Sequence, residues 1–153
     1  MASWHEIEEQ APVFSARVKE LFEAGSSKTI ATLRRDGSPR ISASEAQFEG
    51  DDLIFGMMPG SLKLLDLRRD PRLAMHAPTT EPPADHSERW PGDAKLAGLA
   101  VEVQPSPEAI VDGAAFFRID IREVTLTSVG DPADHLVIES WHPVDGHTRR
   151  IRK

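Results

Sequence analysis

The sequence predicts one α+β domain, mainly β, whose antiparallel strands close into a small barrel. Helical spacing of apolar residues is confined to about the first 25 residues and one short central segment. Six or seven further segments instead show alternation or strand-type composition, and they are separated by glycine, proline and aspartate turns. A length of 153 residues suits a single domain over 1–153.

Residues 1–25 predict an N-terminal helical segment that braces or covers the strands. Ser3 and Glu6 have the spacing of a capping box. Pro12 lacks the N–H that a continuous helix needs, so we expect two short helices, the second starting near Pro12 and stopping at Gly25. The apolar residues at helical spacing are Trp4, Ile7, Ala11, Phe14, Val18, Leu21 and Phe22.

The next segment predicts an antiparallel meander interrupted by one helix. A short helix is expected with Ser61 at its N-cap and a basic last turn ending at Arg69, because Asp70 and Pro71 follow. The expected strands cover 29–35, 40–48, 52–58 and 72–77.

The second half predicts a long loop over 78–93 and three more strands, over 95–103, 116–128 and 135–141. In the strand 116–128 the buried face changes near Glu123, which indicates a bulge or a change of partner sheet. The segment 142–153 is expected to be a basic C-terminal tail. Its cationic residues are Arg149, Arg150, Arg152 and Lys153.

Composition excludes several classes of protein. Without cysteine there is no disulfide, thiolate metal site or thiol nucleophile, and the cytoplasm is the expected compartment. No apolar run is long enough to span a membrane, and the N-terminal residues do not resemble a signal peptide. The net charge of -7 disfavours nucleic acid as a partner, while a local basic pocket for a small anion stays possible.

The first candidate site is the segment 59–63, where a glycine turn leads into a helix. Free backbone N–H groups, the Ser61 hydroxyl and the Lys63 ammonium would converge there on a phosphate. The alternative is an ordinary capped helix with a solvated lysine.

The second candidate site is the hairpin around the turn 36–40. Small residues in the flanks 31–33 and 41–44 would leave backbone groups accessible to a flat ligand. The alternative is a hairpin whose small residues face a closely packed helix.

The sequence gives little support for a metal site or for a hydrolase active site. His135 and His142 are seven residues apart on a strand and point to opposite faces, so we predict no metal site. There is no Gly-x-Ser-x-Gly motif, and we assign neither a nucleophile nor a general base. Trp141 and the tail arginines, like Trp90 of the long loop, either cover a ligand or are solvated.

Taken in order, these motifs resemble one known family. Ala31-Thr32-Leu33, Asp36-Gly37-Ser38-Pro39-Arg40, Ser61-x-Lys63 and Leu67-Arg68-Arg69-Asp70-Pro71-Arg72 are similar to the pyridoxamine 5′-phosphate oxidase-like split barrels that bind FMN. The likeness covers roughly residues 10–141 and is strongest toward short actinobacterial flavin and deazaflavin oxidoreductases. The chain lacks the C-terminal Arg-x-His motif of the long oxidases, so oxidation of pyridoxamine phosphate itself is not expected.

The resemblance implies a six-stranded Greek-key split barrel and a homodimer with FMN in clefts at its interface. Ser61 and Lys63 match the phosphate-binding positions. Arg40 and Ser42 lie on the strand that meets the cofactor, and the segment 31–33, with Thr32 and Leu33, would follow the flavin ring.

The expected function is therefore hydride transfer to or from a small-molecule substrate through non-covalently bound FMN. A second hypothesis is the same fold with the deazaflavin coenzyme, whose acidic tail the arginine-rich chain end would bind. A third is a non-catalytic module that carries flavin or haem, with His76, His135 or His142 as axial ligand. A fourth is an empty site in a chain that only contributes an interface.

Overall fold

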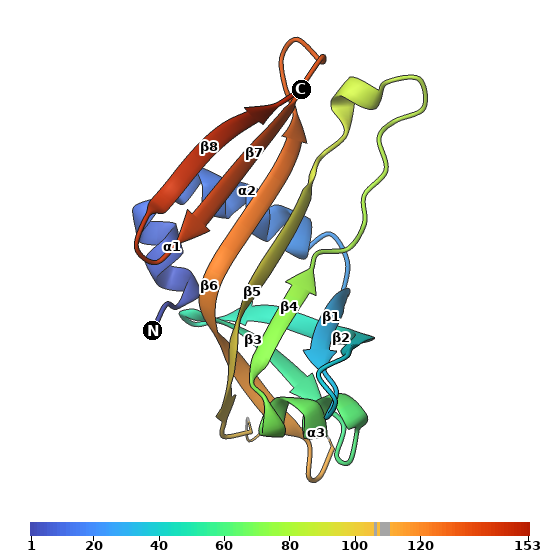
Figure 1. The fold of residues 1–153 in the computed structure, drawn as a ribbon, viewed down its shortest axis with the longest axis vertical. Coiled ribbons are helices and arrows are strands. Elements are labelled where there is room, and N and C mark those ends of the chain that lie inside the picture. The colour runs from blue at the N-terminus through green and yellow to red at the C-terminus, as the bar shows by residue number, and fades with distance from the viewer. Residues whose placement is uncertain (106, 108–110) are drawn as a thin grey trace.

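The computed structural model describes residues 1–105, 107 and 111–153, which form three α-helices, one 3₁₀ turn and eight strands (Figure 1). The helices are α1 (Trp4–Gln10), α2 (Pro12–Phe22) and α3 (Leu62–Arg69). The strands are β1 (Ser27–Leu33), β2 (Pro39–Glu49), β3 (Asp52–Met57), β4 (Arg72–His76), β5 (Asp93–Val103), β6 (Ala115–Val129), β7 (Leu136–His142) and β8 (Gly146–Arg152).

Six of the strands close into a barrel, as predicted. The sheet order is β3-β2-β1-β4-β5-β6-β7-β8, and an additional pairing of β3 with β6 joins the two ends of the six-stranded part. All pairs are antiparallel, and β4 returns to lie beside β1, which makes the first four strands a Greek key. Strands β7 and β8 extend the sheet beyond the barrel (Figure 1).

Strand β6 belongs to both parts, because its two ends have different partners. Residues from Ala115 to Arg118 pair with β3, whereas residues from Val124 to Val129 pair with β7. Opposite β5 the register passes from Ala97–Glu123 to Gly98–Ile121, which leaves Arg122 as a bulge. The predicted bulge near Glu123 is therefore confirmed, whereas the partner of β6 changes from one strand to another within a single sheet and not from one sheet to another.

The two N-terminal helices form where the caps predict. Ser3 and Glu6 make the reciprocal capping box, and Pro12 is the first residue of α2. The helices lie behind β6 and β7, where the Trp141 indole donates to Gln10 at 3.0 Å and Arg17 pairs with the buried Glu139 at 2.8 Å (Figure 1). The helices thus brace the sheet extension against the barrel. Their buried side chains include Trp4, Ile7, Phe14, Val18, Leu21 and Phe22.

The segment 142–153, expected to be a basic C-terminal tail, is a strand for most of its length. This segment forms β8, which pairs with β7 along seven residues after a turn closed by Gly146 at a positive φ of 68°. Nearly all of β8 is solvent-exposed on both faces. Backbone pairing with β7, and not burial of side chains, holds β8 in place. Its sequence therefore lacks the alternating apolar residues by which a strand is recognised.

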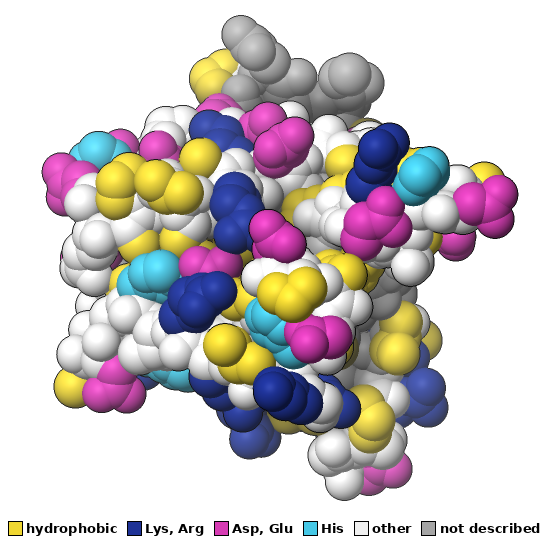
Figure 2. Space-filling view, turned by 90° about the horizontal axis from the view of Figure 1, so that it is seen from above, with side chains coloured by type: hydrophobic (Ala, Val, Ile, Leu, Met, Phe, Trp, Pro, Cys, Tyr) yellow, Lys and Arg dark blue, Asp and Glu magenta, His cyan; other side chains and the backbone are white. Residues whose placement is uncertain are grey.

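The 78–93 loop spans the gap between β4 and β5 and contains a 3₁₀ turn at Ser87–Arg89. It projects from the end of the molecule opposite α3 (Figure 1). Seen from that end, lysine and arginine side chains are interspersed with aspartate and glutamate (Figure 2). None of the helices in the described part of the chain is long and apolar enough to cross a membrane.

Candidate functional site

The six residues predicted to bind a cofactor come together from three elements, β1, β2 and α3. Thr32 lies opposite Arg40 in the β1–β2 ladder, and Ser42 lies opposite Ile30. Helix α3 connects β3 to β4 and packs against β1 at one end of the barrel (Figure 1). The hairpin and the helix thus form a corner at the end of the molecule away from the long loop.

Asp66 of α3 connects the three elements of this corner by hydrogen bonds. Its carboxylate is buried and accepts from the Thr32 hydroxyl at 2.8 Å and from Arg40 Nε at 2.7 Å, both on Oδ2. Arg69 Nη2 donates to the other oxygen, Oδ1, at 3.1 Å and to the Leu33 carbonyl at 2.7 Å. Thr32 is itself 2% exposed, and its hydroxyl is taken up by Asp66.

The charge of Asp66 is maintained despite its burial. Desolvation acts to raise the pKa of the carboxyl group, but the hydrogen bonds from Arg40, Thr32 and Arg69 outweigh it, so that the pKa is lowered from its ordinary value of 3.8. Asp66 is therefore an anion at neutral pH that fixes the positions of two arginines.

We expect Asp66→Asn to lower the free energy of unfolding by roughly 2–3 kcal/mol at pH 7, because two partly buried guanidinium groups lose their counter-charge. The folded-state pKa is depressed, so the stabilisation is present above about pH 4 and is lost as the pH falls through the folded-state value. Urea unfolding of both proteins between pH 3 and 7 measures this.

Asp70→Asn is the matched control, since Asp70 ends the same helix but forms a more exposed ion pair with Arg72. It is expected to cost much less than Asp66→Asn, because solvent screens an exposed ion pair. An equal loss in both variants, or a loss for Asp66→Asn that stays constant down to pH 3, would contradict the role of the buried carboxylate.

Ser61 and Lys63 lie at the start of α3, as the sequence predicts. Ser61 occupies the N-cap position, but its hydroxyl makes no capping bond, and its oxygen is buried without a hydrogen-bond partner. Lys63 Nζ donates to the Ala43 carbonyl on β2 at 2.8 Å. A buried free hydroxyl, an ammonium group and a helix start therefore all belong to this end of α3, and these are donor groups that suit a phosphate.

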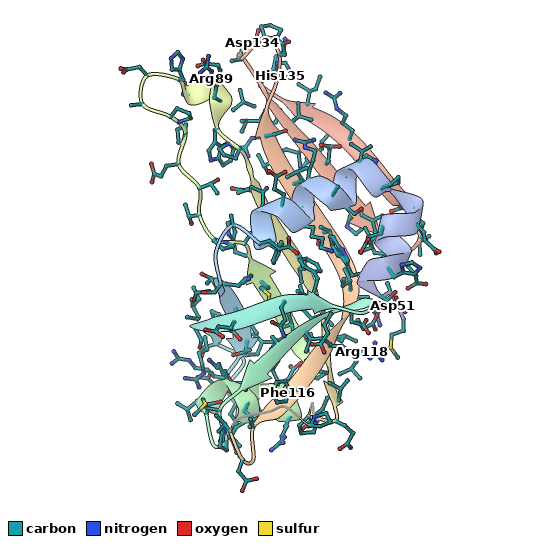
Figure 3. The ribbon with its side chains drawn as sticks, turned by 180° about the vertical axis from the view of Figure 1, so that it is seen from behind. Asp51, Arg89, Phe116, Arg118, Asp134 and His135 are labelled. Carbon is teal, nitrogen blue, oxygen red and sulfur yellow. The ribbon has the colours of Figure 1, made fainter. Side chains whose placement is uncertain are left out.

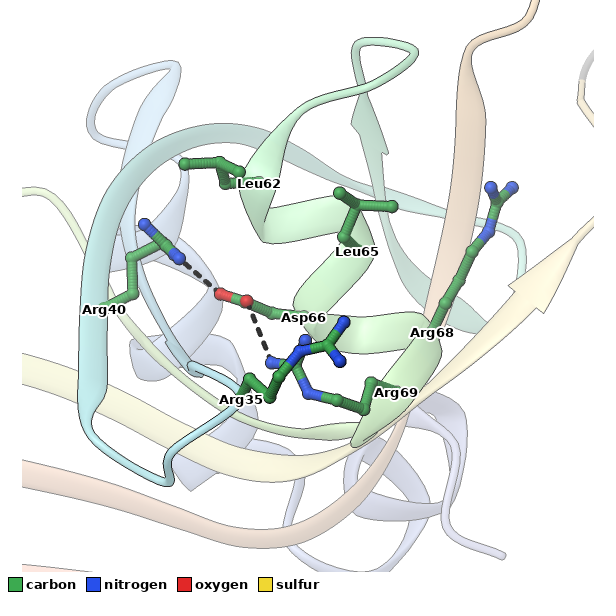
Figure 4. Close-up of a pocket in the computed structure, with 7 residues that line it drawn as sticks. All are labelled: Arg35, Arg40, Leu62, Leu65, Asp66, Arg68 and Arg69. Carbon is green, nitrogen blue, oxygen red and sulfur yellow. Dashed lines mark hydrogen bonds and ion pairs between the residues drawn. The ribbon is translucent and has the colours of Figure 1, made fainter.

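An open pocket of about 610 Å³ lies over the outer face of α3 (Figure 4). Asp66 lies between Arg40 and Arg69 on one side of it, and Leu62 and Leu65 line the other (Figure 4). Arg68 turns away to Glu102 of β5, at 2.6 Å. The residues that line this arginine pocket are Arg35, Arg40, Leu62, Leu65, Asp66, Arg68 and Arg69.

Beside the corner, the outer face of the sheet carries small side chains. Ala31 of β1, Ala74 of β4 and Ala97 of β5 are aligned across three strands. Ile41 lies next in this row on β2 and is 75% exposed. This alanine row is a run of small side chains on the outer face of the sheet. Other exposed apolar side chains near α3 are Met58, Leu62 and Leu65.

The histidines proposed as haem ligands lie elsewhere. His76 is 4.0 Å from Asp93, and His142 is 4.0 Å from Glu123. His135 pairs with Asp134 at the tip of the β6–β7 hairpin, at the same end as Arg89 of the long loop (Figure 3). No group of three or more metal-ligating side chains occurs in residues 1–105, 107 and 111–153.

Sequence reasoning missed Asp66, Arg35 and Arg69. From the sequence, Arg69 belongs to a basic last turn and to a family motif, and Arg35 ends a strand, but neither is singled out as a site residue. One signal was available for Asp66, because it stands among Leu64, Leu65 and Leu67 of a short helix, where a carboxylate on the buried side requires partners.

Neither a family model nor a curated relative matches this chain. Solved structures do match it. A pyridoxamine 5′-phosphate oxidase-related, FMN-binding protein from Nostoc punctiforme is similar over 100% of this chain and 98% of its own, with a TM-score of 0.62 and 10% identity.

PhzG from Burkholderia lata, solved with tetrahydrophenazine-1-carboxylic acid, covers 95% of this chain and 89% of its own, with a TM-score of 0.62 and 12% identity. An F420 reductase covers 69% and 94%, with a TM-score of 0.52 and 17% identity. At these identities the likeness establishes the fold, which is the split barrel that the motifs predicted.

Proposed function

We propose that this chain, which has the split-barrel fold of pyridoxamine 5′-phosphate oxidase-related proteins, binds FMN without a covalent link and transfers hydride to or from a small organic molecule. The observation that carries the proposal is the buried, unpartnered Ser61 hydroxyl beside Lys63 at the start of α3. A buried hydroxyl without a partner costs free energy, and an accepting phosphate oxygen would remove that cost.

The residues present fit the phosphate of FMN. The Lys63 ammonium now donates to the Ala43 carbonyl and would turn to a phosphate oxygen, because a charge-assisted bond is the stronger one. Arg40 uses Nε for Asp66, which leaves its two terminal nitrogens for an anion approaching from the Ser42 side of β2. These groups would hold the cofactor by one end.

The flavin ring would lie against the outer face of the hairpin, along the segment 31–33 and the alanine row. Small side chains let a flat ring approach the backbone of β1 closely. When bound, the flavin supplies the hydride chemistry itself. The protein's part is to orient the ring, exclude water from one of its faces and stabilise negative charge on the reduced form with Lys63 and Arg40.

A second copy of this chain would cover the other side of the ring. Ile41 and Met58 are each more than half exposed around the corner. Apolar side chains gathered in this way are typical of an interface, and a symmetric dimer would bury them twice. We therefore propose a homodimer whose two flavin sites are completed across this face.

The deazaflavin coenzyme is the second candidate, and β8 favours it. The outer sheet face continues from the alanine row across β6 and β7 to Arg150, which lies opposite Ile138. Arg152 lies on the same side two residues further along. A cationic edge at this place would attract a long acidic tail, which FMN lacks.

The test is a calorimetric titration of the cofactor-free protein with FMN, riboflavin and the deazaflavin coenzyme, combined with sedimentation over a dilution series. We expect FMN to bind more tightly than riboflavin, because only FMN has the phosphate, and we expect dilution to the monomer to release it. Tight binding of the deazaflavin coenzyme alone would select the second candidate. Binding of none of the three would refute both.

A further inference from the structure

The arginine pocket holds more positive charge than its own residues neutralise. Arg68 is neutralised by Glu102. The remaining three arginines, Arg35, Arg40 and Arg69, face a single carboxylate, Asp66, and therefore leave two positive charges. Arg35 forms no hydrogen bond or ion pair with any residue that the structure describes, and it lines the same pocket as Arg69 (Figure 4).

Hydrogen bonds to the fold hold two of these arginines in place. Arg69 is fixed by the Leu33 carbonyl and by Asp66, and Arg40 is fixed by Asp66 through Nε alone. Each retains N–H groups that these bonds do not use. Like charges held together without a ligand repel one another, so an anion between them gains from an arrangement that the fold has already formed.

The pocket is separate from the phosphate corner at Ser61 and Lys63. Lys63 is anchored to the carbonyl of Ala43, which lies opposite Thr29 in the β1–β2 ladder, whereas Arg69 is anchored to the carbonyl of Leu33. Four strand positions from Thr29 to Leu33 correspond to about 13 Å. A single phosphate group spans much less, so the two cationic clusters suit two different anionic groups.

The remaining lining of the pocket is apolar. Leu62 is 60% exposed and Leu65 is 50% exposed, and both lie on its rim (Figure 4). A free inorganic anion would leave these leucines in water. An anion attached to a small apolar group would cover them, which adds a hydrophobic contribution to the ionic one.

We infer that the arginine pocket is a second anion-binding site, which takes a phosphate monoester carried on a small apolar group. Two surplus positive charges match a dianion, and planar guanidinium groups match the oxygens of a phosphate. The second site shares Arg40 with the proposed flavin site and rests on the proposed function to that extent, but it is distinguished by Arg35, Arg69 and Leu65, none of which contributes to the proposed phosphate site at Ser61 and Lys63. It provides the protein with a place for a phosphorylated substrate or effector beside the proposed redox site.

The test uses phenyl phosphate as the probe, with the full chain in FMN-free and FMN-saturated form and calorimetry at low salt. We expect phenyl phosphate to bind both forms, inorganic phosphate to bind more weakly and benzyl alcohol not to bind. Arg35→Gln should weaken phenyl phosphate about tenfold and leave FMN affinity within twofold.

Arg34→Gln is the matched control, because Arg34 is the exposed neighbour of Arg35 in the same turn but does not line the pocket. It should change the affinity for phenyl phosphate less than twofold. An equal effect of both variants would mean general surface charge and would overturn the inference, as would the absence of binding to the unmodified protein.

Two further outcomes separate this inference from the proposed function. If Arg35→Gln weakens FMN as much as phenyl phosphate, the pocket is the cofactor's own phosphate site and the second site does not exist. If FMN fails to bind while phenyl phosphate binds and depends on Arg35, the proposed flavin function is refuted and the second site stands.

Discussion

Replacing Lys63 by alanine is expected to weaken FMN binding about 10- to 150-fold, which corresponds to roughly 1.5–3 kcal/mol for a charge-assisted hydrogen bond. Lys63 is the only lysine in α3, and its ammonium reaches across to β2, so removing it leaves the Ser61 hydroxyl and the helix start without a neighbouring cation on that side. Fluorescence titration of wild type and variant with FMN measures the change.

Riboflavin is the ligand-side control for Lys63→Ala, because it has the same ring and no phosphate. Its affinity should be unchanged within about twofold. Lys153→Ala, which removes a charge at the far end of β8, controls for net charge and should leave both ligands unaffected. Equal weakening of FMN and riboflavin would indicate damage to the ring surface instead of loss of a phosphate contact.

Replacing Gly98 by alanine is expected to lower the free energy of unfolding by about 3 kcal/mol. Gly98 is buried on β5 at the point where the register shifts past the bulge at Arg122, and a Cβ there would overlap the backbone oxygen of Asp120 and press on Ile119. Backbone cannot move aside as a flexible side chain can, so the cost lies at the upper end of that for overpacking.

Chemical denaturation followed by circular dichroism measures the effect of Gly98→Ala. Ala97→Gly is the control on the neighbouring residue, since it removes a Cβ instead of adding one and should cost about 1 kcal/mol or less. A Gly98→Ala protein as stable as wild type would show that β5 and β6 are not as close at the bulge as the structure has them.

The bulge itself illustrates what a local pattern can predict. The alternation of buried residues along β6 changes phase between Ile121 and Val124, and because side chains alternate with period two, one extra residue must lie between them. The capping box at Ser3 and the helix break at Pro12 are equally local, since their donors and acceptors lie within a few residues of sequence. Such features need no knowledge of the rest of the chain.

Strand β8, in contrast, could not be predicted from a local sequence pattern. Its arginines carry no strand signal, and it exists because β7 offers a free edge to a chain that turns back at Gly146. Edge pairing depends on backbone groups, which are the same in every residue, so composition cannot reveal it.

The candidate site contains both kinds of feature, those that follow from local sequence and those that depend on the fold. The barrel strands, the inserted helix and the placement of Ser61 and Lys63 at that helix's start can be predicted locally, because turn residues, periodicity and caps act over short distances. The contacts of Asp66 with Thr32, Arg40 and Arg69 depend on the packing of β1, β2 and α3, because these partners lie up to 34 residues apart. The surplus charge of the arginine pocket likewise depends on the fold, because the order of residues along the chain does not show which arginines are paired with a carboxylate.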